Sequence, residues 1–94
     1  MEVRIRVPTA LRELVAGARV VTVKVDAPVT VDATLDALAH EHPALERRVR
    51  DEQRRRRVHV NLFVGPDNVR DRNGLATPIA LGQELSIIPA ISGG

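Results

Sequence analysis

The feature that most constrains the fold is one amphipathic helical segment in a chain that otherwise alternates in the manner of β-strands. Val31, Leu35 and Leu38 recur at helical spacing and form a single apolar stripe that must pack on another element. Thr30 precedes this stripe, where its hydroxyl can accept an unpaired N–H of the first helical turn. Pro43 is expected to end the helix near residues 40–42, with one or two further helical turns over 44–50.

Apolar and polar residues alternate elsewhere, as in half-buried strands. The predicted strands cover residues 3–7, 19–25, 58–64 and 84–89, with a short return strand at Val69 and Arg70. Thr9 is expected to cap a short helical turn that Gly17 ends. One main helix cannot cover both faces of a sheet, so the sheet should have one helix-covered face and one open face.

This order of elements, with a helix crossing after the first hairpin, is the β-grasp (ubiquitin-like) arrangement. We predict an α+β fold with a mixed sheet of four to five strands and one main helix on one face. The β-grasp domain is expected to span residues 1–89, followed by a flexible tail over residues 90–94. The first and last strands should lie side by side in parallel, which would put the tail at the sheet edge.

The chain ends on two glycines, Gly93 and Gly94. Glycine lacks a Cβ atom and has the widest backbone freedom, so this pair can enter a channel too narrow for other residues. A thin arm of this kind delivers its own α-carboxylate. One interpretation is therefore a carrier whose C-terminal carboxylate is the reacting group, and the other is an ordinary frayed terminus.

Composition excludes several function classes. The chain has no cysteine, which rules out disulfides, thiolate metal sites and a cysteine nucleophile. A net charge of +2 and a single aromatic residue, Phe63, argue against nucleic-acid binding. No apolar run approaches the about 20 residues of a membrane span, and charged residues near the start argue against a signal peptide. We therefore expect a cytoplasmic protein that does not bind membranes.

Two groups of side chains have a structural and a functional interpretation. His40, His42 and His59 do not form a ligand set, because the first two do not share a helix face, and no metal site is expected. Arg54–Arg57 is expected to be a solvated loop within a basic cluster that also contains Arg47, Arg48 and Arg50. The functional alternative for this cluster is electrostatic guidance to an acidic partner.

Four segments carry a resemblance to a known family: Leu11–Leu14, Val60–Val64, Asn73–Thr77 and Ile87–Gly94. With them the chain resembles the ubiquitin-like sulfur carrier proteins. These include the small subunit of molybdopterin synthase, the thiamine-pathway carrier and the carrier of a cysteine pathway that uses O-phosphoserine. The Gly-Leu-Ala-Thr stretch and the Pro-Ala-x-x-Gly-Gly ending look closest to the cysteine-pathway type. Gly82-Gln83-Glu84 departs from the usual Gly-Asp of the family, at a turn.

The resemblance implies a carrier co-substrate rather than an enzyme. An adenylating enzyme of the ubiquitin-activating type would use ATP to activate the Gly94 carboxylate, and a sulfurtransferase or persulfide donor would convert it to a thiocarboxylate. A client enzyme would then take the sulfur for cysteine, molybdopterin or a specialised metabolite. No stably bound cofactor is implied. A ubiquitin-like modifier, joined through Gly94 to target lysines, and a binding module with an inert tail remain the alternatives.

The open face of the sheet is the expected docking surface. If Val60 and Leu62 face the helix, Phe63 and Ile88 should lie close together on the opposite face. The alternative is that Phe63 belongs to the core. The predicted partner-binding set adds the residues that lead into the tail: Pro89, Ala90, Ile91 and Ser92.

Overall fold

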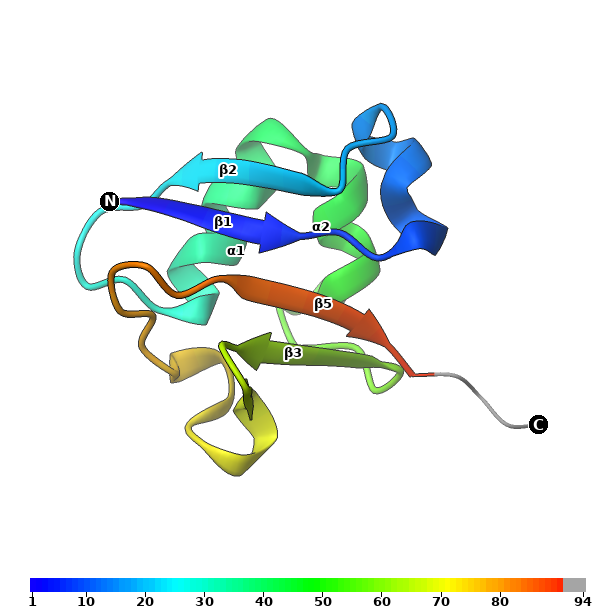
Figure 1. Cartoon of the computed structure of the whole chain (residues 1–94). Helices are drawn as coiled ribbons and strands as arrows, with labels where there is room; N and C mark the ends of the chain where they lie inside the picture. The colour runs from blue at the N-terminus through cyan, green and yellow to red at the C-terminus, as the bar shows by residue number, and fades with distance from the viewer. Residues whose placement is uncertain (91–94) are drawn as a thin grey trace.

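The computed structural model of the chain describes residues 1–90. Its strands are β1 (Glu2–Arg6), β2 (Val20–Lys24), β3 (Val60–Val64), β4 (Asp67–Asn68) and β5 (Leu85–Pro89), and its α-helices are α1 (Val31–Glu41) and α2 (Pro43–Val49) (Figure 1). Three short 3₁₀ helices complete the elements: η1 (Thr9–Val15), η2 (Val69–Asp71) and η3 (Gly74–Ala76).

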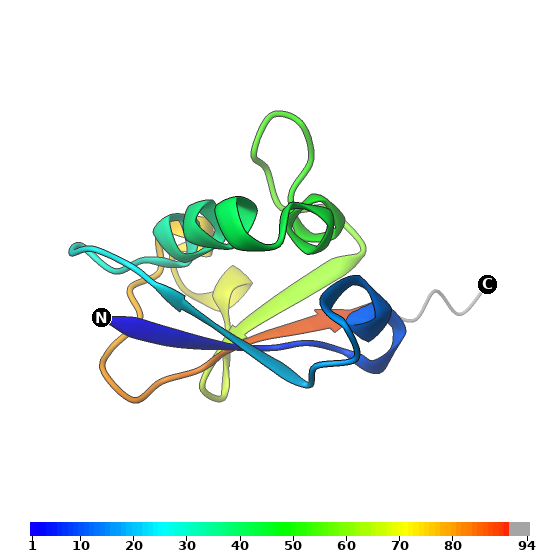
Figure 2. The ribbon, with the colours of Figure 1, turned by 90° about the horizontal axis from the view of Figure 1, so that it is seen from above.

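The strands form one five-stranded sheet in the order β2-β1-β5-β3-β4. β1 pairs antiparallel with β2 and parallel with β5, while β3 pairs antiparallel with both β5 and β4. Both α-helices lie on the same face of this sheet, as Figure 2 shows from above. The predicted α+β fold with a mixed sheet and one helix-covered face is confirmed.

The position of β5 corrects one detail of the prediction. β5 lies beside β1 in parallel, as expected, but it is the central strand, with β1 on one side and β3 on the other. The chain therefore leaves the domain at the end of the sheet rather than along an edge strand. Residues 91–94 lie outside the described part of the chain, so the predicted tail over 90–94 stays a prediction.

Local sequence explains where α1 begins and ends. The Thr30 side chain accepts the backbone N–H of Ala33 at 3.1 Å, which confirms the predicted cap. The helix ends at Glu41, and Pro43 begins α2 at a position where its missing N–H is not needed. The predicted stripe is fully buried and packs against aliphatic side chains from the sheet, which include Ile5, Leu62 and Leu85.

One of the predicted local elements is wrong, and another is confirmed without its predicted cap. Val69 and Arg70 do not form a return strand: the Asn68 side chain accepts the N–H of Arg70 at 3.0 Å and starts the η2 turn there. The return strand is instead β4, which begins two residues earlier, at Asp67. The predicted helical turn near Thr9 is confirmed as η1, but Thr9 is its first residue and not its cap: no side chain caps η1, and the carbonyl of Pro8 accepts the N–H of Leu11.

The third long strand starts two residues later than predicted. The N–H of Val60 donates to the carbonyl of Arg57 at 3.1 Å, so a turn occupies the residues before the strand. Val58 therefore stays 71% exposed, outside the sheet. This placement leaves an apolar side chain in solvent close to the end of β5.

Candidate functional site

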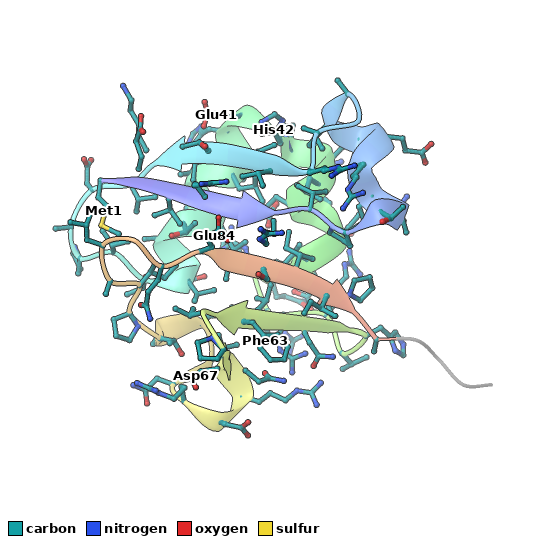
Figure 3. All side chains as sticks on the ribbon, in the orientation of Figure 1. Met1, Glu41, His42, Phe63, Asp67 and Glu84 are labelled. Atoms are coloured by element: carbon teal, nitrogen blue, oxygen red, sulfur yellow. The ribbon has the colours of Figure 1, made fainter. Side chains whose placement is uncertain are left out.

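The open face of the sheet carries the predicted pair. Phe63 on β3 lies directly opposite Ser86 on β5, and Ile88 lies opposite Asn61. Phe63 and Ile88 are thus diagonal neighbours on the face away from the helices, close enough for an aromatic side chain to reach its neighbour. Phe63 is half-buried and Ile88 is 46% exposed. Figure 3 views this face, with Phe63 labelled on β3. The predicted placement is confirmed, and the binding role stays a prediction.

The last described residues are held against β3. Pro89 pairs with Val60 in the sheet, and the N–H of Ala90 donates to the carbonyl of His59 at 2.6 Å. The chain thus has a fixed point of departure beside the open face. Four of the predicted site residues lie outside the described residues: Ile91, Ser92, Gly93 and Gly94.

A charged cluster occupies the start of β5 on the open face. Glu84 lies 2.9 Å from Arg6 and 3.2 Å from Arg4. The hydrogen bond from Arg6 and the positive charge of both arginines hold the pKa of Glu84 below its ordinary value. The open face therefore has an ion cluster of net charge +1 at one end of β5 and an apolar patch, Phe63 with Ile88, towards the other.

We expect Glu84→Gln to make the stability of the domain less dependent on acidic pH. Because the folded pKa of Glu84 is lowered, its contact stabilises the protein above the unfolded value near 4.5 and is lost as the pH falls through the folded pKa. Urea unfolding at neutral and at acidic pH measures this. The wild-type protein should be more stable than the variant at neutral pH, and the difference should shrink in acid. A difference that stays constant with pH would contradict the assignment, and Glu13→Gln serves as the control.

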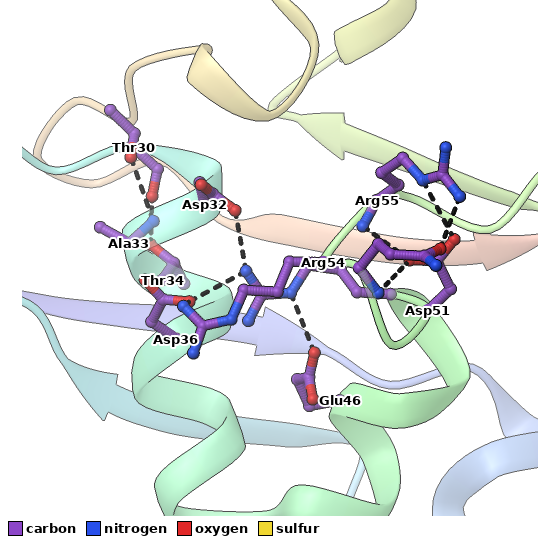
Figure 4. Close-up of polar contacts among 11 residues, drawn as sticks. Thr30, Asp32, Ala33, Thr34, Asp36, Glu46, Asp51, Arg54 and Arg55 are labelled. Atoms are coloured by element: carbon purple, nitrogen blue, oxygen red, sulfur yellow. Dashed lines mark hydrogen bonds and ion pairs between the residues drawn. The ribbon is translucent and has the colours of Figure 1, made fainter.

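Arg50 is the largest departure from the predicted basic cluster. Its side chain is buried and contacts three carboxylates: Nη1 lies 2.8 Å from Asp32 and 2.9 Å from Asp36, and Nε lies 2.9 Å from Glu46. Figure 4 shows these carboxylates arriving from both α-helices. The inclusion of Arg50 in a solvated cluster was wrong. The sequence signal that could have predicted these ion pairs is the i,i+4 spacing of Glu46 with Arg50, and of Asp32 with Asp36 on one face of α1.

The charge of Arg50 is fully compensated. Burial by itself would lower the pKa of Arg50, but hydrogen bonds and negative charge from Glu46 and Asp36 outweigh it and raise the pKa. The residue stays charged and joins α1 to α2. We assign Arg50 a structural role, as the point from which the following loop departs.

The loop that follows Arg50 is ordered by Asp51. Its carboxylate accepts the backbone N–H groups of Gln53 at 2.9 Å and Arg55 at 3.0 Å, and these bonds, that to Arg55 foremost, lower the pKa of Asp51. Arg54 and Arg55 are more than 70% exposed, as predicted. Arg56 differs, because its guanidinium donates to the carbonyl of Val60 at 2.6 Å.

Two further features bear on function. Within residues 1–90, no group of three His, Cys, Asp or Glu side chains is placed to hold a metal ion. The same part of the chain contains no helix with the length and hydrophobicity needed to cross a membrane.

The sequence of the chain matches a known protein family and named proteins of other organisms. Residues 5–94 match the ThiS family. The sulfur carrier protein CysO of Mycobacterium tuberculosis is 33% identical over 96 aligned positions, which cover all of both chains. The small archaeal modifier protein 1 of Haloferax volcanii is 42% identical over 84 positions, covering 85% of this chain and 87% of the relative.

Solved structures agree with this relationship. A crystal structure of the BexX/CysO complex of Amycolatopsis orientalis contains a chain that superposes with a TM-score of 0.84 at 29% identity, covering 98% of this chain and 99% of that one. The small archaeal modifier protein 1 of H. volcanii superposes with a TM-score of 0.82 at 35% identity over all of both chains. The predicted resemblance is confirmed: the chain belongs to the ThiS family, among the ubiquitin-like sulfur carrier proteins.

Proposed function

We propose that this protein is a sulfur carrier whose Gly94 carboxylate is converted to a thiocarboxylate that donates sulfur to a biosynthetic partner enzyme. The observation that carries the proposal is the likeness to a sulfur carrier protein along the whole chain. The residues Gly93 and Gly94, and the central position of β5 beside an open sheet face, support it. The carrier is a co-substrate, and its partners supply catalysis.

Activation would begin at the carboxylate, because a free carboxylate resists nucleophiles. Its oxygen attacks the α-phosphorus of ATP in the adenylating partner, pyrophosphate leaves, and an acyl-adenylate forms. Sulfide then attacks the carbonyl carbon and AMP leaves, so that one oxygen of Gly94 is replaced by sulfur. With a persulfide donor, a second thiol must release the carrier by forming a disulfide. ATP is consumed by the partner, and the carrier itself holds no cofactor.

The chain contributes geometry and an unreactive interior. It contains no cysteine, so no internal thiol can attack the activated end. The absence of Cβ atoms at Gly93 and Gly94 suits entry into a closed active site. A client enzyme for cysteine, molybdopterin or another sulfur-containing metabolite would receive the sulfur, in the cytoplasm where the activating reaction has its ATP.

The test is the intact mass of the protein after incubation with ATP, a sulfur donor and a carrier-adenylating enzyme. We expect a gain equal to the exchange of one oxygen for one sulfur in the wild-type protein. A variant without Gly94 should show no gain. A gain in both proteins, or none in the wild type with each of several active adenylating enzymes, would contradict the proposal.

A second function is favoured by one observation, the 42% identity with the small archaeal modifier protein 1. In this alternative the amine of a target lysine attacks the same acyl-adenylate, directly or through a thioester, and forms an isopeptide bond to Gly94. Detection of that bond in cell proteins by peptide mass spectrometry would support it. Lys24 is the only lysine of the chain, so Lys24→Arg distinguishes conjugates with targets from self-conjugates.

A further inference from the structure

A groove lies beside the point where the chain leaves β5. Its volume is about 550 Å³, and Pro89 and Ala90 form part of its lining. Leu11, Val58 and Val60 give it an apolar floor, of which Val58 is 71% exposed. Two of the predicted partner-binding residues therefore line a surface distinct from the patch formed by Phe63 and Ile88.

The rim of the groove carries three arginines that form no ion pair within the described residues. Arg48, Arg56 and Arg57 line it, and no ion pair within residues 1–90 involves any of them. Their neighbours in the sequence differ, since Arg54 pairs with Asp36 and Arg55 with Asp51. The ion pairs within residues 1–90 thus leave these three arginines without a salt bridge at the end of β5.

Backbone carbonyls fix two of these arginines in place. Arg57 donates from Nε to the carbonyl of Arg47 at 2.7 Å, and Arg56 donates from Nη1 to the carbonyls of Val60 and Arg57. These bonds orient each guanidinium without cancelling its charge. Burial and the nearby positive charge of Arg70 lower the pKa of Arg56, which agrees with a local excess of positive charge.

The carboxylate among the described lining residues, Asp51, offsets only part of this excess: the charge of Arg57 helps to lower the pKa of Asp51, but three arginines and one aspartate leave a net charge of +2. Asp51 already accepts two backbone N–H groups and lies 3.5 Å from the guanidinium of Arg55. An incoming anion would therefore meet oriented arginines over an apolar floor. Charged rims of this kind raise association rates, and an apolar floor adds affinity once the partner is seated.

We propose that this groove receives an acidic segment of the adenylating enzyme, with an apolar side chain seated on Val58 and carboxylates paired with Arg48 and Arg57. This inference rests on the proposed function, because it assigns a partner to the carrier. It places a second contact beside the departure of the chain, so that the enzyme would hold the domain on both sides of Pro89.

A polypeptide fits the groove better than a nucleic acid. Single-stranded nucleic acids bind through several bases that stack on successive aromatic rings, but the groove has one imidazole, His59, and Phe63, the one Phe, Tyr or Trp of the chain, lies on the open face of the sheet. The apolar floor instead offers aliphatic contacts to Leu, Ile or Val. Positive charge beside aliphatic surface, with no Phe, Tyr or Trp in the lining, matches an acidic, hydrophobic protein segment.

Thiocarboxylation kinetics provide the test. We expect the double variant Arg48→Glu with Arg57→Glu to lower kcat/KM at low salt by about tenfold or more and to reduce its dependence on ionic strength. The control is Lys24→Glu, which reverses one positive charge where the double variant reverses two. Lys24 lies at the opposite end of the sheet, paired with Glu2. This control should change kcat/KM by less than about twofold. Val58→Ser should lower kcat/KM at both low and high salt, because salt does not screen the apolar contact of Val58 with the partner.

The two proposals fail in distinguishable ways. Wild-type protein that acquires no sulfur contradicts the proposed function. Wild-type protein that acquires sulfur, with arginine variants that match Lys24→Glu at every salt concentration, contradicts the groove alone. NMR titration of the free protein with a peptide of leucine flanked by glutamates should shift the amides of Val58 and Ala90. Stronger shifts at these amides with an oligouridylate of equal charge would overturn the choice of a protein partner.

Discussion

Replacing Arg50 by alanine should lower the free energy of unfolding by about 3 kcal/mol, because it leaves carboxylates without their cation. The side chain of Arg50 is 1% exposed, and that of Glu46 is 14% exposed. Asp32 and Asp36 are about half exposed, which keeps the expected loss at the lower end for a broken buried pair. Urea unfolding followed by circular dichroism at neutral pH measures the change.

The matched control is Arg54→Ala, in the loop that follows. Arg54 also approaches Asp36, at 3.4 Å, but its side chain is 73% exposed. A solvent-exposed pair of this kind contributes at most about 1 kcal/mol. The double change Arg50→Met with Glu46→Leu should recover part of the loss, since it removes the buried carboxylate with the arginine. Equal losses for Arg50→Ala and Arg54→Ala would show that Arg50 does not join the two helices.

Ile88→Asp should weaken the complex with the adenylating enzyme by roughly 30-fold, or about 2 kcal/mol. Ile88 is 46% exposed beside Phe63 on the open face, so a carboxylate there would be desolvated on docking. The same substitution should change the free energy of unfolding by less than about 1 kcal/mol, because nearly half of the residue is already exposed to solvent. Isothermal titration calorimetry and urea unfolding give the two values.

Thr22→Asp controls for the added charge. Thr22 is exposed on the same face, but on the edge strand β2, which β1 separates from β5. The Thr22→Asp variant should bind the adenylating enzyme with an affinity within about twofold of the wild type, if docking is confined to the patch. Phe63→Ala completes the test: a large loss of stability with unchanged affinity would assign Phe63 to the core and refute the patch.

Local pattern was sufficient for most of the fold. The spacing of Val31, Leu35 and Leu38 and the position of Thr30 predicted α1, because helix periodicity and capping depend on neighbouring residues. Alternation predicted the long strands, and with them the open face that carries Phe63 and Ile88. The errors arose at Val69, where the Asn68 side chain starts a 3₁₀ turn in place of a strand, and at Thr9, which begins the predicted turn but does not cap it.

The sequence by itself thus determined most of the secondary structure, the sheet with one open face, and the family, since these follow from periodicity and from motifs along the chain. Only the tertiary structure decided which arginines are neutralised. Arg50 meets Asp32 and Asp36, 18 and 14 positions earlier, because α2 packs beside α1. Arg57 donates to the backbone carbonyl of Arg47, forms no ion pair within residues 1–90, and lines the groove at Pro89. The sequence shows where each positive charge is. Whether a carboxylate neutralises that charge depends on contacts between elements that are distant along the chain.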